Sequence, residues 1–320
     1  MTQAELNPFS GSDDNKRYLT YSHYLKKRFG TKVYKVPLDT DMGCPNRDGS
    51  KGVGGCAFCS AKRSGDFAGD PRESILSQYE HMRTVMEKKW QGGKCIPYFQ
   101  AGSNTYTDIR TLAHMLDTAM SLPDAAGVSI ATRADCLDEE KCSLLGEYSK
   151  NTYLVCELGL QTVNDNTARL MNRCHSFYDF LKGYEMLRKH GVNVCVHLIN
   201  GLPGETHDDM LTSARVISSL ELHMVKLHLL HILKGTPLEK MYLSGSFAAM
   251  ELYDYVNIIA DQIECFDKNV IIGRVTGDGA RADLIAPLWS LDKKRVMNEI
   301  DKELFRRKSY QGVRYVCKQG

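Results

Sequence analysis

The sequence lacks the features that a membrane-bound or exported protein requires. None of its apolar runs reaches the roughly 18 residues that a membrane helix needs. Residues 1–15 are polar and contain no apolar core of the kind found in a signal peptide. With 42% apolar and 25% charged residues in 320 positions, the chain has enough apolar material for one large core or two modest ones. We therefore expect a globular, cytoplasmic protein with no membrane contact.

A disulfide framework is also not expected. The chain has eleven cysteines, but the cytoplasm is reducing and a chain of this length does not need covalent cross-links. Some of these cysteines should therefore bind a metal or take part in a reaction.

The chain has little excess charge, because its formal net charge is only +2. Two segments depart from this balance. Seven Lys and Arg residues and no acidic residue lie from Lys16 to Lys35, and residues 293–320 contain nine Lys and Arg residues and three acidic ones. Each segment predicts either a solvated helix face or a basic patch that binds phosphate groups.

Short apolar runs alternate with segments of helical periodicity along most of the chain. We expect strands at 31–37, 95–100, 127–133, 153–161, 192–200 and 224–230. We expect helices at 75–90, 108–122, 138–150, 177–187, 207–220 and 252–266, followed by a short strand at 270–274 and a helix at 292–307. Six alternations of strand and helix predict an α/β protein with a parallel sheet, arranged as a partial (βα)6 TIM-like barrel with a small C-terminal extension. An open doubly wound sheet is the alternative, but its G-x-G-x-x-G turn after the first strand is absent.

The pattern divides the chain into three parts. They are a basic N-terminal extension (1–30), the barrel (31–268) and a C-terminal extension packed on the barrel (269–320). Polar residues follow the expected strands at 100–104, 133, 157–161 and 200–205. Because the carboxyl ends of parallel strands share one rim, we expect the site at that rim.

The first connection carries the most informative motif. Residues 41–60 read DMGCPNRDGSKGVGGCAFCS, in which eleven residues separate Cys44 from the Cys56–Cys59 pair. Five glycines in this loop let the chain fold back, so that three thiolates can meet at one metal centre. Three thiolates are one too few for a structural zinc site or an electron-transfer cluster, but they suit a four-iron cluster with one open iron.

Two other interpretations of the cysteine loop remain open. A zinc site would need a fourth ligand, and the pair His223 and His228 is separated by an odd number of strand positions, which sends the side chains to opposite faces. A redox pair at Cys56 and Cys59 is the other possibility, although such pairs usually start a helix in a smaller fold. The other eight cysteines are isolated, and we expect most of them to be small core residues.

The sequence resembles the radical-SAM superfamily, and within it the bacterial group related to the catalytic subunit of elongator. The resemblance covers nearly the whole chain and rests on an ordered set of motifs: CPNRDG (44–49), GGCAFC (54–59), ELGLQT (157–162), NRCH (172–175), HLINGLPGET (197–206) and APLWSLDKKRV (286–296). The wide gap after Cys44 departs from the C-x3-C-x2-C spacing that is commoner in the superfamily.

The resemblance implies a [4Fe-4S] cluster on Cys44, Cys56 and Cys59 and S-adenosylmethionine bound to its open iron. Reductive cleavage then gives a 5'-deoxyadenosyl radical, with the electron supplied by a flavodoxin- or ferredoxin-type donor. The cofactor-binding residues implied are Phe58, Gln100, Gly102, Glu157, Gln161, Arg173, Asn200, Gly201 and Gly204. Glu157 as a buried structural acid, and Arg173 with His175 as a polar pair at a helix end, are the plainer alternatives. The histidines at 197, 223, 228 and 231 are expected to be packed residues.

The resemblance also suggests a substrate. The chain has no room for the acetyltransferase domain that accompanies the elongator subunit, which makes the building of a carboxymethyl group improbable. We expect tRNA as the partner, with carboxymethylaminomethyl at carbon 5 of the wobble uridine shortened to aminomethyl. The alternatives are a radical-SAM oxidase or decarboxylase of a small metabolite, which the GLPGET motif suggests, and a non-enzymatic cluster or zinc protein that binds RNA.

Overall fold

The computed structural model describes residues 7–88, 92–277 and 279–316. The chain forms two compact units and passes between them four times. Leu25–Leu160 and Asn172–Cys195 form one unit, which we call the cysteine unit. The described residues of Met1–Tyr24, Gln161–Met171 and Val196–Gly320 form the other, which we call the C-terminal unit. The expected boundaries after residues 30 and 268 stay predictions.

The strands form one mainly parallel sheet, which confirms the α/β class and the partial-barrel fold. Its order is β1-β2-β3-β4-β5-β6-β8. All six expected strands are present, at Val33–Leu38 (β1), Lys94–Phe99 (β2), Gly127–Thr132 (β3), Tyr153–Gln161 (β4), Asn193–Asn200 (β5) and Met224–Leu229 (β6). The pairs β1–β2, β2–β3 and β3–β4 are parallel, as expected for strands joined by helical crossovers.

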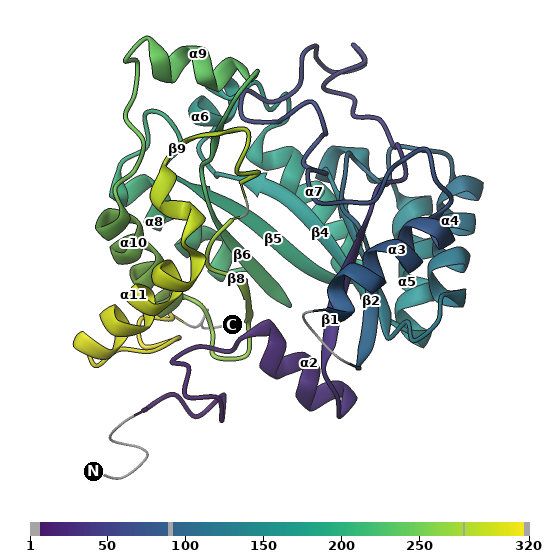
Figure 1. Cartoon of the computed structure of the whole chain (residues 1–320), viewed down its shortest axis with the longest axis horizontal. Coiled ribbons are helices and arrows are strands. Elements are labelled where there is room, and N and C mark those ends of the chain that lie inside the picture. Colours follow the sequence, from purple (N-terminus) through teal and green to yellow (C-terminus); the bar gives the residue numbers. More distant parts are fainter. Residues whose placement is uncertain (1–6, 89–91, 278, 317–320) are drawn as a thin grey trace. The chain divides into compact units, whose positions relative to one another are not determined.

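In the cysteine unit, helices pack beside the strands that they connect (Figure 1). They are α3 (Ile75–Glu87), α4 (Ile109–Ser121), α5 (Glu139–Asn151) and α7 (Phe177–Lys189), and a short turn, η1 (Ala134–Cys136), contacts α7. Side-chain caps fix where these helices begin: Asp108 accepts hydrogen bonds from the first-turn N–H groups of α4, and Ser176 forms a capping box with Asp179 in α7. Residues 89–91, at the end of the expected helix 75–90, lie outside the described residues.

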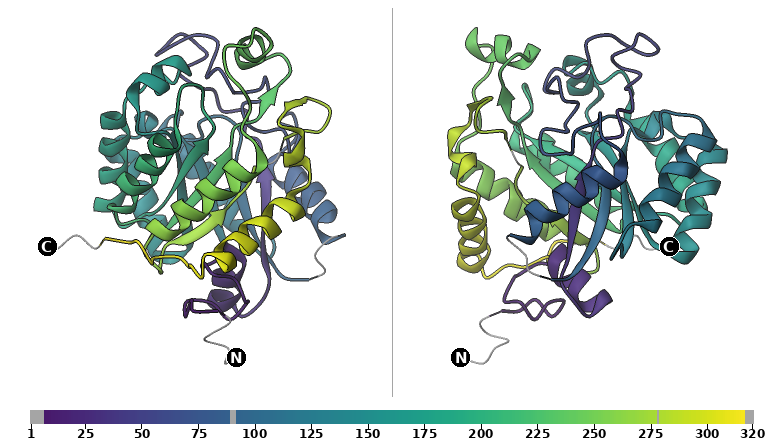
Figure 2. Two further views of the ribbon diagram at one scale, coloured as in Figure 1. Left: turned by 90° about the vertical axis from the view of Figure 1, so that its left-hand side faces the viewer. Right: turned by 45° about the vertical axis from the view of Figure 1, so that its right-hand side comes forward.

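The C-terminal unit contains α8 (His207–Ser218), α9 (Pro237–Leu243), α10 (Leu252–Cys265) and α11 (Lys293–Arg306). Figure 2 shows α11 running beside α10, and the buried face of α11 consists of Val296, Ile300 and Leu304. The short strand expected after residue 268 is β8 (Ile271–Arg274). It pairs in parallel with β6 and is the seventh strand of the sheet.

Several short elements were not expected from the sequence. They are α2 (Tyr21–Phe29), α6 (Asp165–Leu170), the two-stranded pair β7 (Ile232–Leu233) and β9 (Leu284–Ala286), α9, and the turn η2 (Leu288–Leu291). Among the residues described, no helix combines the length and the apolar character needed to cross a bilayer.

Candidate functional site

The cysteine loop connects β1 to α3 without regular secondary structure. Cys56 is buried, and Cys44 and Cys59 are half-buried. The sulfur of Cys56 accepts two hydrogen bonds, from Nη1 of Arg173 at 3.3 Å and from Nδ2 of Asn46 at 3.5 Å. A sulfur that receives N–H donors in a buried position suits a thiolate ligand, because donors stabilise its negative charge.

The three thiols share one neighbourhood. The backbone N–H of Cys59 donates to the carbonyl of Cys56 at 2.9 Å, and burial, followed by the charge of Cys56, raises the pKa of the Cys59 thiol. Burial on its own would lower the pKa of Arg133, but the ion pair with Asp135 and the charges of Cys56 and Cys44 raise it overall. Cys44 and Cys56 thus lie within electrostatic reach of the same guanidinium group.

The three sulfurs are not spaced as the ligands of a single metal ion would be. Among the residues that the structure describes, these three sulfurs do not form a group whose members all lie within 4.8 Å of one another. Ligands of one tetrahedral zinc would do so, because each zinc–sulfur bond is only about 2.3 Å long. At least one pair of these sulfurs is therefore farther apart than the ligands of a single zinc ion would be.

The NRCH segment lies against the cysteine loop. Asn172 donates from Nδ2 to the carbonyls of Val53 (3.0 Å) and Gly55 (2.8 Å), and Asn46 donates to the carbonyl of Asn172. Arg173, only 6% exposed, donates to the carbonyl of Gly159 as well as to Cys56. The sequence resemblance gave Arg173 a cofactor-binding role, whereas its contacts in the structure are with a cysteine sulfur, a backbone carbonyl and His175.

The turn after β2 is also attached to the cysteine loop. Gln100 donates from Nε2 to the carbonyl of Ser64 at 2.8 Å. Gly102 has φ +73°, and a Cβ there would lie 2.2 Å from the carbonyl oxygen of Met42. Only glycine fits this close approach. Asn104 shapes the turn by donating from Nδ2 to the carbonyls of Phe99, Ala101 and Ala131.

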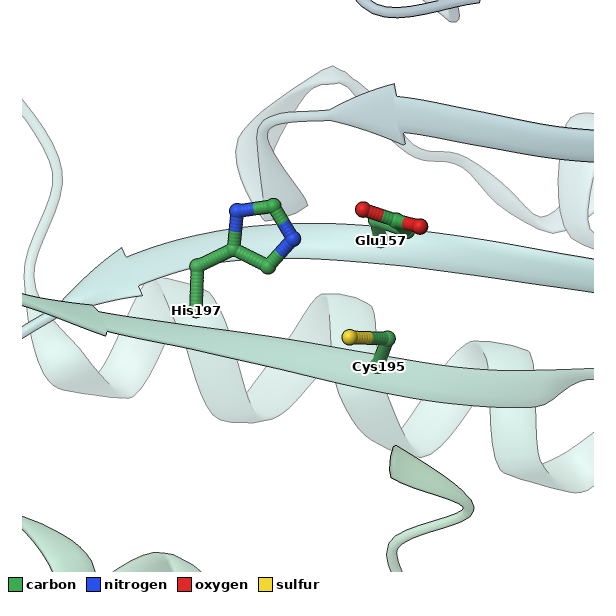
Figure 3. A group of neighbouring side chains, drawn as sticks. All are labelled: Glu157, Cys195 and His197. Carbon is green, nitrogen blue, oxygen red and sulfur yellow. The ribbon is translucent and has the colours of Figure 1, made fainter. Parts of the chain in front are cut away.

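Glu157 lies at the centre of a buried polar group in the cysteine unit. Its side chain is fully buried. It pairs with Lys35 and accepts hydrogen bonds from Ser129 (2.8 Å) and Tyr98 (2.9 Å). The ammonium group of Lys35 also lies 4.3 Å from the ring centre of Tyr98. The sulfur of Cys195 on β5 and a carboxylate oxygen of Glu157 lie within 4.8 Å of each other (Figure 3).

The contact between Lys35 and Glu157 shows that the sheet is curved in this unit. Lys35 is on β1 and Glu157 on β4, so three strand spacings separate them, about 14 Å in a flat sheet. Their side chains meet because strands β1 to β4 curl around the face that carries them. The sequence analysis counted Lys35 in a surface basic segment, and this was wrong, because its side chain is 17% exposed and ion-paired.

The expected cofactor residues of the C-terminal unit differ from one another in what they contact. Gln161 has φ +79°, and its buried Oε1 has no hydrogen-bond partner among the described residues. Strain together with an unpaired polar atom is typical of a ligand-binding position. Asn200, by contrast, exchanges two amide hydrogen bonds with Gln262, at 2.9 and 2.8 Å. Gly201 (φ +88°) and Gly204 (φ +83°) line a cavity of about 400 Å³.

The remaining expected site residues are less informative. Phe58 is half-buried next to Cys59. The rings of His197 and His228 lie 5.0 Å apart. Burial, followed by the charges of Lys293 and Arg274, lowers the pKa of His231 to about 4. A neutral, half-buried His231 agrees with the expectation of a packed histidine.

The two basic segments are only partly available to a ligand. In the N-terminal segment, Lys16 pairs with Asp301 and Arg17 donates to the carbonyl of Ser309. In the C-terminal segment, Arg307 pairs with Asp261, Glu264 and Glu303. The exposed basic residues include Lys26, Lys27, Lys294, Arg295 and Lys308.

Comparison with known proteins supports the resemblance seen in the motifs. Residues 43–217 match the model of the Radical SAM superfamily, and residues 222–306 match that of the Radical_SAM C-terminal domain. The protein YtqA of Bacillus subtilis is 45% identical over 306 residues, which are 96% of this chain and 95% of YtqA. The solved structure of Elp3 from Methanocaldococcus infernus superimposes with a TM-score of 0.64 at 17% identity, covering 86% of this chain and 64% of that one.

More distant relatives have different activities in their names. A tRNA uridine(34) acetyltransferase of Methanocaldococcus infernus is 26% identical over 152 residues, which are 47% of this chain and 28% of that protein. A biotin synthase of Thermotoga neapolitana is 25% identical over 225 residues, which are 69% of this chain and 75% of that protein.

Proposed function

The chain belongs to the radical SAM superfamily, and from that premise we propose that Cys44, Cys56 and Cys59 hold its [4Fe-4S] cluster. The protein is an enzyme of this superfamily and uses a [4Fe-4S] cluster and S-adenosylmethionine. The observation that carries the residue assignment is Cys56, a buried sulfur that accepts hydrogen bonds from Arg173 and Asn46. When bound, the two cofactors supply a 5'-deoxyadenosyl radical that takes a hydrogen atom from the substrate.

The residues around the loop have separate roles in this proposal. Gln100 and Gly102 hold the turn after β2 against the loop and leave its backbone to bind the methionine end of the cofactor. Phe58 packs beside the adenine. Gln161 offers its unpaired amide oxygen to a ligand N–H. Gly201 and Gly204 allow close approach of the backbone.

The cluster assignment is tested by substitution of cysteines. Protein reconstituted without oxygen should hold about four irons and four sulfides and absorb near 400 nm, roughly where thiolate-to-iron bands fall. Cys56→Ala should lose this cluster. Cys265→Ala is the matched control, because Cys265 is a buried core residue on α10 and its loss should leave the iron content unchanged. Tightly bound zinc in place of iron would overturn the assignment.

We propose tRNA as the substrate, with carboxymethylaminomethyl at carbon 5 of the wobble uridine shortened to aminomethyl. Two observations support this: the relative named as a tRNA uridine(34) acetyltransferase and the exposed basic residues at 26, 27, 294, 295 and 308. The conversion breaks the bond between the amine nitrogen and the carboxymethyl carbon. Oxidation of that carbon by two electrons, followed by addition of water, releases glyoxylate. Two electrons match the reduction of one S-adenosylmethionine to methionine and 5'-deoxyadenosine.

The tRNA proposal is tested with tRNA that carries carboxymethylaminomethyluridine. We expect aminomethyluridine and 5'-deoxyadenosine in equal amounts and steeply salt-dependent binding. Reversing the charge at Lys294 and Arg295 should weaken tRNA binding and leave slow 5'-deoxyadenosine formation intact. Lys182→Glu, an exposed substitution outside both basic segments, is the control. Formation of S-adenosylhomocysteine alone would instead indicate a methyltransferase.

A radical enzyme that acts on a small metabolite is the second candidate, because the biotin synthase of Thermotoga neapolitana aligns with more than two thirds of this chain. This alternative predicts that tRNA does not stimulate turnover and that the charge reversals change nothing. A protein that only binds RNA would form no 5'-deoxyadenosine at all. An unchanged wobble nucleoside both in vitro and in a strain lacking the gene would exclude the tRNA proposal.

A further inference from the structure

Arg173 has an environment that the sequence did not predict. It is buried, carries a positive charge, and points Nη1 at the sulfur of Cys56. We propose that Arg173, assisted by Asn46, raises the reduction potential of the cluster by donating hydrogen bonds to the Cys56 thiolate. This inference rests on the proposed assignment of Cys56 as a cluster ligand.

The geometry of Arg173 is fixed by groups other than the thiol. Nη2 donates to the carbonyl of Gly159 on β4 and lies 2.7 Å from Nε2 of His175. The other ring nitrogen of His175, Nδ1, lies 3.3 Å from the carbonyl of Ser176. Because a carbonyl can only accept, Nδ1 carries the ring proton and Nε2 accepts from Arg173.

The charges around His175 are consistent with this arrangement. Burial, followed by the positive charges of Arg173 and Arg133, lowers the pKa of His175 to about 3. The ring is therefore neutral at physiological pH and can act as an acceptor. Arg173 is held through Nη2 by two acceptors, and its other terminal nitrogen, Nη1, is directed at Cys56.

Arg173 also lacks the partner that a buried cation normally has. The nearby buried Arg133 forms a two-pronged pair with Asp135, at 2.9 Å for each contact. Arg173, in contrast, has no carboxylate partner among the described residues, and its buried Nε has no hydrogen-bond acceptor there. A buried guanidinium is costly unless an anion compensates it. The thiolate of Cys56 is the anion that its contacts provide.

Asn46 adds a second donor to the same sulfur. Its Nδ2 is shared between Cys56 and the carbonyl of Asn172, so that the NRCH segment and the cysteine loop position this amide together. The packing is tight here: a Cβ at Gly52 would lie 2.3 Å from Oδ1 of Asn46 and 2.6 Å from the sulfur of Cys174. This packing restricts movement of the Asn46 amide away from Cys56.

The electrostatic consequence has a definite sign. One-electron reduction adds a negative charge to the cluster and its thiolates. A fixed cation and N–H donors stabilise that added charge, and hydrogen bonds to the sulfurs are among the factors that set cluster potentials. Removing Arg173 should therefore make the cluster harder to reduce.

The test is a reductive titration of the reconstituted full-length protein, followed by electron paramagnetic resonance of the reduced cluster. Arg173→Gln removes the charge, and we expect its ratio of reduced to oxidised cluster at a fixed solution potential to fall about tenfold, which for a one-electron couple is about 59 mV. Arg173→Lys keeps the charge but loses the planar fork, so its shift should be smaller and in the same direction. Lys182→Gln, which removes an exposed charge on α7, should not shift the potential.

The outcomes separate this inference from the cofactor assignment. If Arg173→Gln and Arg173→Lys both hold four irons at the wild-type potential, the inference is wrong and the cluster assignment stands. If Arg173→Gln does not retain iron, the reduction potential of the Arg173→Lys cluster is measured instead. A potential equal to that of the wild type overturns the inference, and a more negative potential supports it. If the wild-type protein forms no cluster, the assignment of Cys56 fails first.

Discussion

Replacing Lys35 by Met tests whether the buried group around Glu157 holds the cysteine unit together. The substitution keeps most of the side-chain volume but removes the cation from a carboxylate that is 0% exposed. Ser129 and Tyr98 would continue to donate to Glu157, but the carboxylate would lose the ammonium group with which it pairs. Removing one partner of a buried ion pair typically costs about 3 to 5 kcal/mol. Because Lys35 is 17% exposed and water can partly replace it, we expect a loss of about 3 kcal/mol.

The assay is urea denaturation of the cluster-free protein, followed by circular dichroism. The double variant Lys35→Met/Glu157→Gln should recover much of the lost free energy of unfolding, because the amide can be buried without a counter-charge. Lys26→Met, on the exposed face of α2, is the control.

A Lys35→Met variant no less stable than the Lys26→Met control would refute this reasoning. The reasoning would also be refuted by a double variant whose loss of unfolding free energy exceeds the sum of the losses in the two single variants. Either result would mean that Glu157 is solvated, and the curled arrangement of β1 to β4 around it would then have to be questioned.

Three further changes test other parts of the structure. Asn200→Ala should lower the free energy of unfolding by about 1–3 kcal/mol, because Oε1 of the buried Gln262 loses the hydrogen bond that Asn200 donates. An unaltered urea midpoint would contradict the structural role of Asn200. Folding lowers the pKa of His231 from 6.5 to about 4. The stability that depends on the neutral ring is therefore fully present above about pH 6.5 and is lost as the pH falls toward 4, with a slope on the order of 1 kcal/mol per pH unit. His231→Gln should flatten that slope in a series of urea titrations at different pH values. Residue 102 has φ +73°, and a Cβ there would lie 2.2 Å from the Met42 carbonyl. Gly102→Ala should therefore displace the cysteine loop and speed amide exchange at residues 41–44. Gly245→Ala is the control, because Gly245 has a positive φ but open space around it, and it should leave that exchange unchanged.

The sequence predicted the long elements well, because their patterns are strong. The strand expected at 153–161 matches β4, which is buried along most of its length. Of the helices that were expected, those with side-chain caps begin within one residue of the expected positions. The elements that the sequence did not predict lie where its periodic pattern of apolar residues is weak. Only Leu25 of α2 is buried, so its charged sequence resembled a surface patch, and β7 and β9 are too short to show any periodicity.

The candidate ligands were found from the sequence because they lie close together in it and have a distinctive spacing. Their supporting residues could not be found in the same way. Asn172 and Arg173 come more than one hundred residues after the loop that they contact, and nothing in a lone asparagine or arginine indicates which loop it will meet. Only the fold brings the NRCH segment to Cys56.

The pairing of Lys35 with Glu157 shows the physical reason most clearly. The direct register partners of these residues are Ile96 and Ala131, so local pairing rules give no sign that the two charges meet. Their contact depends on the strand order and on how far the sheet curls over three strand spacings. Both are collective properties of the whole sheet. A lysine inside an apolar strand and a glutamate inside another were visible in the sequence, and each requires a buried partner. The sequence could therefore have shown that two counter-charges were needed, but only the curvature of the sheet determines that these two residues satisfy each other.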